Sequence, residues 1–116
     1  MNLVELTPAE RSLLGVGLSQ WRGPARPTSA IIKALGFSRP TFAAEVSRLR
    51  DRIVAGEALD GRDWTRALIA TEVVFVSDVV GAGVEWETCT GLSDAETIVT
   101  LRSLQRKLVS LCAPLG

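Results

Sequence analysis

The feature that most constrains the fold is the apolar run Asp63–Val80, the most apolar segment of the chain. Its length of about 18 residues and its helix-forming first half favour a buried helix. Its second half is rich in valine, and β-branched residues also suit a buried strand, which is the rival interpretation. We expect a helix because Asp60 and Asp63 stand at the spacing of a capping box. The run therefore predicts a buried central helix at about residues 61–80, ended by Gly81–Gly83.

The N-terminal segment carries the start and stop signals of another helix. Thr7 and Glu10 form a capping-box pattern with a proline at the first helical position, so a helix is expected to begin there. It should end at residues 23–24, a Gly-Pro pair. Gly15 and Gly17 lie inside this predicted helix, where glycine lowers helix stability but permits a close crossing by a second helix.

Two shorter helices are predicted next, joined by a tight turn. Thr28 can cap the first of them, and Gly36 can close it in the left-handed conformation. Ser38 is expected to cap the second helix, which should end before Gly56. Phe37 stands at the hydrophobic-staple spacing from the first residue of an apolar stripe on that helix. The stripe consists of Phe42, Val46, Leu49 and Ile53.

The last predicted helix begins at Ser93–Glu96, the clearest capping box in the chain. Its leucines alternate three and four residues apart and form one seam, which we assign to the core and to a dimer interface. These leucines are Leu101, Leu104, Leu108 and Leu111. Residues 84–90, before this helix, are expected to be an irregular or briefly extended link. With five predicted helices, residues 1–116 should form one all-α domain.

The charges are balanced over the chain but not along it. Lysine and arginine total 13, as do aspartate and glutamate, so the net charge at pH 7 is zero. Residues 1–53 carry eight basic and four acidic side chains, a net charge of +4, and residues 54–116 carry the opposite charge of −4. Such asymmetry occurs in a basic binding surface backed by an acidic region and, more commonly, in a solvated mosaic surface.

The cellular setting is predicted from cysteine content and hydropathy. Cys89 and Cys112, without a signal-peptide pattern, predict a reduced cytoplasmic protein, although a disulfide between them stays an open alternative. Glu72 and Asp78 interrupt the longest apolar stretch, so no membrane span is expected. The apolar content of 47% exceeds what a lone domain of this size needs and favours a dimer.

No catalytic or metal-binding set emerges from the sequence. Histidine is absent, which removes the commonest general base and a common metal ligand. The two cysteines lie 23 positions apart without a second pair, so a zinc site is not expected. Glu72 and Asp78 should lie about 240° apart on their helix, as edge residues or as partners of Arg66 or Arg102. Neither an enzyme nor a cofactor is therefore expected. The tryptophans are expected to pack in the core rather than stack on a ligand: Trp21, Trp64 and Trp86.

Residues 28–53 combine a short helix, a glycine turn and a serine before a second helix, with the sequence LGFSRPTF at residues 35–42. This pattern resembles the helix-turn-helix of bacterial transcription regulators of the MarR and TetR kind. In such regulators the second helix enters the major groove by its N-terminal end. The resemblance implies contacts with double-stranded DNA, some of them to phosphates. The implied DNA contacts are Arg39, Thr41 and Arg48, and the implied phosphate contacts are Lys33 and Arg52. A two-helix αα-corner in a protein that does not bind DNA would show the same pattern.

Two hypotheses of function follow. The first is a small dimeric DNA-binding regulator, in which residues 8–53 form the head and residues 54–116 supply the core and the dimerisation helices. The second is a non-catalytic helical interaction module, such as an adaptor, an inhibitor or an immunity-type protein, with a protein partner. Both hypotheses have no metal, no cofactor and no membrane partner.

Overall fold

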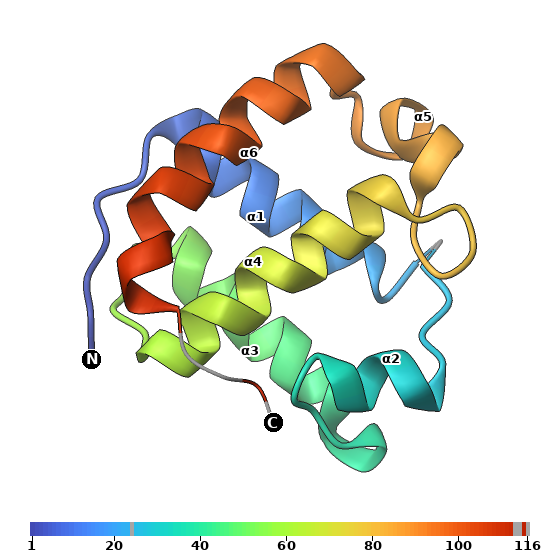
Figure 1. Cartoon of the computed structure of the whole chain (residues 1–116), viewed down its shortest axis with the longest axis horizontal. Coiled ribbons are helices and arrows are strands. Elements are labelled where there is room, and N and C mark those ends of the chain that lie inside the picture. Colours follow the sequence, from blue (N-terminus) through green and yellow to red (C-terminus); the bar gives the residue numbers. More distant parts are fainter. Residues whose placement is uncertain (24, 113–114, 116) are drawn as a thin grey trace.

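A computed structural model describes residues 1–23, 25–112 and 115. Within these residues the fold is all-α, with three 3₁₀ turns and one isolated backbone bridge between Asn2 and Leu59 (Figure 1). The α-helices of this part of the chain are α1 (Pro8–Gln20), α2 (Ser29–Ala34), α3 (Phe42–Val54), α4 (Gly61–Val76), α5 (Trp86–Thr90) and α6 (Asp94–Leu108). The 3₁₀ turns are Arg39–Thr41, Gly83–Glu85 and Val109–Leu111. The predicted all-α fold is therefore confirmed.

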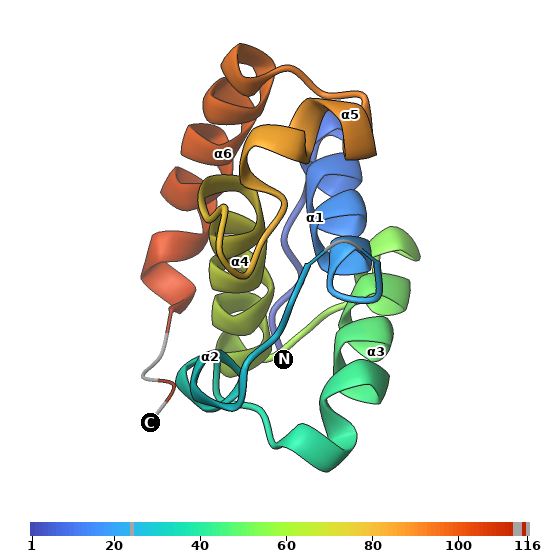
Figure 2. The same ribbon diagram turned by 90° about the vertical axis from the view of Figure 1, so that its right-hand side faces the viewer.

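The core lies where α1 and α4 cross, with α3 and α6 on opposite sides of this pair (Figure 2). Helix α1 packs against α3, α4 and α6, so it shares the central position that the sequence assigned to α4 alone. Gly17 permits the crossing, because a Cβ atom at this position would lie 2.7 Å from Cγ2 of Thr71 on α4. The expected close crossing at the glycines of α1 is confirmed.

Helix α4 is buried as predicted, but it ends at Val76 rather than at residue 80. Ser77 has extended backbone angles, and its Oγ accepts hydrogen bonds from the amides of Val79 and Val80, both at 3.2 Å. Short polar side chains that bind nearby amides compete with the helix in this way. The helix predicted from the apolar run was therefore too long. Val76 and Val79, at its end and just beyond it, are more than 70% exposed.

The capping patterns of the sequence were mostly correct. Thr7 and Glu10 form the complete capping box, and Ser93 Oγ accepts the amide of Glu96 at 3.1 Å. Asp60 accepts the amide of Asp63 at 2.7 Å, as expected, while the Asp63 carboxylate binds elsewhere.

Two local predictions were wrong. Ser38 makes no capping hydrogen bond to a backbone amide, because its hydroxyl pairs with the Thr41 hydroxyl at 2.8 Å. Residues 84–90 are helical rather than extended, since Trp86 anchors α5 in the core at 0% exposure and donates Nε1–H to Thr97 Oγ1 at 2.8 Å.

The tryptophans lie in the core, as predicted. Trp21 and Trp64 are at most 4% exposed, like Trp86, and their indole N–H groups donate to backbone carbonyls at 3.1 and 2.9 Å. A buried indole of this kind has its only donor satisfied, so each ring locks a helix end. Among the described helices, every one is too short or too polar to cross a bilayer.

Candidate nucleic-acid interface

The segment that resembles a helix-turn-helix folds into two helices joined by a left-handed turn. Gly36 has φ +82°, as the sequence predicted, and a residue with a side chain would be strained there. Phe37 and Phe42 pack edge to face across the turn with ring centroids 5.4 Å apart, so the predicted staple is present. Trp21 packs edge to face on Phe42 at 5.7 Å, which attaches the turn to the end of α1.

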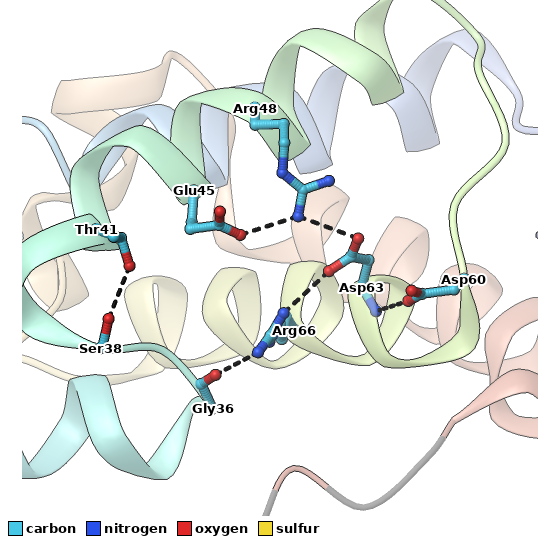
Figure 3. Close-up of polar contacts among 8 residues, drawn as sticks. All are labelled: Gly36, Ser38, Thr41, Glu45, Arg48, Asp60, Asp63 and Arg66. Atoms are coloured by element: carbon cyan, nitrogen blue, oxygen red, sulfur yellow. Dashed lines mark hydrogen bonds and ion pairs between the residues drawn. The ribbon is translucent and has the colours of Figure 1, made fainter.

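Arg48 points toward α4, although its side chain is still 36% exposed (Figure 3). Its Nη2 lies 3.0 Å from Glu45 Oε2 and 3.1 Å from Asp63 Oδ2, so it bridges two carboxylates. Partial burial would lower the pKa of this guanidinium, but the hydrogen bonds that it donates to Glu45 and Asp63, with the negative charges of these carboxylates, outweigh burial and raise the pKa. A guanidinium held by two carboxylates has little positive charge left to offer a phosphate.

Asp63 is the centre of this network, a role that was not predicted from the sequence. The carboxylate is 10% exposed and binds Arg66 Nη1 at 3.1 Å as well as Arg48. Arg66 also donates to the Gly36 carbonyl and stacks over the Phe37 ring, 4.9 Å from its centroid (Figure 3). These contacts join the turn before α3 to the start of α4, so this polar cluster holds the helix corner together.

The other residues implied in DNA binding have separate surroundings. Arg39 folds back over the start of α2, where Nε donates to Ser29 Oγ at 3.2 Å. Thr41 pairs with Ser38, as described above. Arg52 lies 3.8 Å from Glu57, near the end of α3. Lys33 is exposed on α2 and makes no hydrogen bond or ion pair with the described residues. Among the described residues, no hydrogen bond or ion pair joins any two of these five side chains.

Several exposed cations near the corner have no ion pair with an acidic residue among the described residues. They include Arg22, Lys33 and Arg39. Arg22 follows α1 and donates to Ser47 Oγ on α3 at 2.8 Å, and Arg39 starts the 3₁₀ turn before α3. Arg22 lies outside the segment that resembles the motif, so the resemblance does not assign it to DNA.

The leucine seam of α6 is used inside the chain. Leu101, Leu104 and Leu108 are 7%, 0% and 0% exposed, and Leu111 is partly buried at the edge of the same core. The helix packs this face on α1 and α4. A dimer formed through these leucines would have to pull α6 off its own core.

The flank of α6 beside the end of α4 presents an apolar surface that was not predicted from the sequence. At its centre Val76 and Ile98 are 73% and 49% exposed, and Val84 is 86% exposed. Two adjoining grooves share Phe75 and Val76; one reaches Arg102 and Gln105 on α6, and the other reaches Asp94 at its start. We refer to the residues Phe75, Val76, Val84, Asp94, Ile98 and Arg102 as the α4–α6 patch.

A second buried polar cluster joins α1 to α6. Glu10 is 1% exposed and accepts from Lys107 Nζ at 2.6 Å, from Ser103 Oγ at 2.5 Å and from the Thr7 amide at 2.8 Å. Burial raises the pKa of this carboxyl, but hydrogen bonds from Lys107, Ser103 and Thr7, with the charge of Lys107, lower it to about 2. The sequence identified the cap but not the lysine 97 positions away.

Among the described residues, the two carboxylates singled out in the apolar run form no ion pair with an arginine. Glu72 accepts from Gln105 Nε2 on α6 at 2.6 Å, and Asp78 accepts from the Val84 amide at 2.6 Å. Both cysteines are exposed and free. Among the described residues, no three histidine, cysteine, aspartate or glutamate side chains are grouped as a metal site.

Comparisons of the chain with protein-family models, with curated proteins and with solved structures gave no significant match. The resemblance to helix-turn-helix regulators therefore stays a prediction from residues 28–53.

Proposed function

We propose that this chain is a non-catalytic helical interaction module that binds a protein partner through the α4–α6 patch. The observation that carries the proposal is the cluster of exposed apolar side chains Val76, Val84 and Ile98 beside one another. Single exposed apolar residues are normal on a folded protein, whereas a contiguous apolar surface with a polar rim is typical of a protein interface.

The polar rim of the patch supports this proposal. Arg102 Nη1 donates to Gln105 Oε1 at 2.9 Å, and Gln105 Nε2 donates to Glu72 Oε2 at 2.6 Å. These bonds restrain long side chains before a partner arrives, which reduces the conformational entropy lost on binding. The groove beside this rim has a volume of about 290 Å³, which is enough space for a side chain of a partner.

The test is an interaction assay with an apolar-to-acid substitution in the patch. The tagged chain is used to isolate complexes from its native host, and bound proteins are identified and quantified. We expect one stoichiometric partner that is retained by the wild type and lost by Ile98→Asp. The matched control is Val54→Asp, because Val54 is similarly exposed, at 56%, but lies on α3. Equal loss in both variants, or loss in the control alone, would contradict the proposal.

DNA binding is the second candidate, and it is supported by the exposed cations near the corner that have no ion pair with an acidic residue among the described residues, including Arg22, Lys33 and Arg39. Such cations supply affinity for phosphates that weakens as salt rises. Fluorescence anisotropy with a pool of duplex fragments tests this candidate. It predicts that Lys33→Ala/Arg39→Ala weakens binding and reduces the salt dependence, while Arg102→Ala changes neither. If the two variants bind DNA equally well, the surface around Lys33 and Arg39 is not the DNA-binding surface.

A further inference from the structure

We propose that the partner at the α4–α6 patch is a second copy of this chain, placed by a twofold axis that passes close to Ile98. This inference rests on the proposed function, since it uses the same surface and names its occupant. In a twofold contact the same residues serve both chains, so the surface must complement itself.

The charges of α6 meet this requirement. Asp94, Ile98 and Arg102 are spaced four residues apart, so they lie along one face of the helix. At 1.5 Å per residue, the acid and the base stand about 6 Å on either side of the isoleucine. When two such helices meet antiparallel at Ile98, Asp94 of each copy faces Arg102 of the other. One contact therefore creates two identical ion pairs.

Neither charge is already neutralised in the single chain. Asp94 has no ion pair among the described residues, and Arg102 is held only by the neutral Gln105 amide oxygen. This differs from the arginines of α3, which bind carboxylates of their own chain, as Arg48 does. The acid and the base on α6 are thus available to a partner, and both are exposed.

The centre of the patch supplies the apolar part of the contact. Ile98 is flanked by Val76 from the end of α4, with Phe75 beneath both in the adjoining grooves. Antiparallel pairing at Ile98 places these side chains of the two copies against each other and removes them from water. The inner face of α6 stays on its own core, so the single-chain fold is unchanged.

The position of the patch leaves the helix corner free. In Figure 1 α6 runs along one edge of the molecule, and the turn between α2 and α3 lies at the opposite edge. A twofold pairing through α6 would therefore place the two corners far from the contact, one on each side.

Charge reversal in one chain and then in the other tests the pairing. Sedimentation equilibrium over micromolar to millimolar concentrations should show a monomer–dimer equilibrium for the wild type. Asp94→Arg places like charges together at both ion pairs, and so does Arg102→Asp, so each variant should raise the dimer dissociation constant at least about tenfold. An equimolar mixture of the two variants should associate again, because all charges at the contact are then opposite.

The mixture also controls for misfolding, since an unfolded variant would not be rescued by its counterpart. A monomeric wild type, or a mixture no more associated than its components, overturns the inference. If the wild type is monomeric and Ile98→Asp still releases a different protein, only the identity of the partner is wrong. If the wild type is monomeric and no patch variant changes any interaction, the proposed function also fails.

Discussion

Glutamine in place of Glu10 is expected to lower stability at neutral pH and to lower it less in acid. The carboxyl pKa is about 2 in the folded chain and about 4.5 when exposed. At 1.36 kcal/mol for each pKa unit, ionisation of this group stabilises the fold by about 3 kcal/mol at pH 7. The side chain is 1% exposed, so solvent screens this interaction only weakly.

The pH dependence has a defined sign. Because folding lowers the pKa, the stabilisation is fully present above about pH 4.5 and is lost as the pH falls toward 2. About 2 kcal/mol should already be lost by pH 3, where the unfolded chain has bound the proton and the folded chain has not. The glutamine in Glu10→Gln is uncharged at every pH. The difference between the variant and the wild type in free energy of unfolding should therefore shrink from about 3 kcal/mol at pH 7 to about 1 kcal/mol at pH 3.

Urea unfolding at pH 7 and pH 3 measures this difference directly. The other titrating groups are the same in both proteins, so their contributions to the pH dependence of stability cancel. Glu87→Gln is the control, since Glu87 is an exposed carboxylate on α5 and its replacement should change little at either pH. A destabilisation by Glu10→Gln that is the same at both pH values would refute the reasoning, because the charge of Glu10 would then contribute nothing specific to folding.

Three further substitutions probe the core and the helix corner by urea unfolding. Asp63→Ala should cost about 2 kcal/mol because two arginines lose their shared acceptor, and an unchanged stability would exclude that role. Gly17→Ala should cost about 1–3 kcal/mol through the contact of its new methyl group with Thr71, and Thr71→Ala should restore most of it; a loss that persists would indicate another cause. Thr71→Val should raise stability by about 1 kcal/mol, because the buried Thr71 hydroxyl has no hydrogen-bond partner among the described residues; destabilisation would indicate a hidden partner.

Local features of the fold could be predicted from sequence because their partners lie within a few residues. The capping boxes at Thr7 and Ser93 and the left-handed Gly36 are interactions of this kind. The end of α4 was missed because hydropathy does not record that Ser77 binds the amides that follow it. The short helix α5 was missed because it depends on the burial of Trp86, a tertiary contact.

The candidate site was harder to predict because its ion pairs join residues that are far apart in the sequence and close only in the folded chain. Arg48 and Asp63 are 15 positions apart, and Glu10 and Lys107 are 97 apart. A basic residue on a predicted recognition helix looks the same in the sequence whether it faces solvent or a carboxylate. Only the crossing of α3 and α4 decides that Arg48 is neutralised while Arg39 is not.

Helix α6 shows the same ambiguity for apolar residues. The spacing of Leu101, Leu104 and Leu108 identifies a buried face, but it does not say whether the chain itself or a second copy covers that face. Once α1 and α4 cover it, the residues available to a partner are those on the flank of α6 beside the end of α4, where Ile98 stands between Asp94 and Arg102. A predicted seam and a dimer contact can therefore both belong to one helix on different faces, and the charge-reversal mixture distinguishes them.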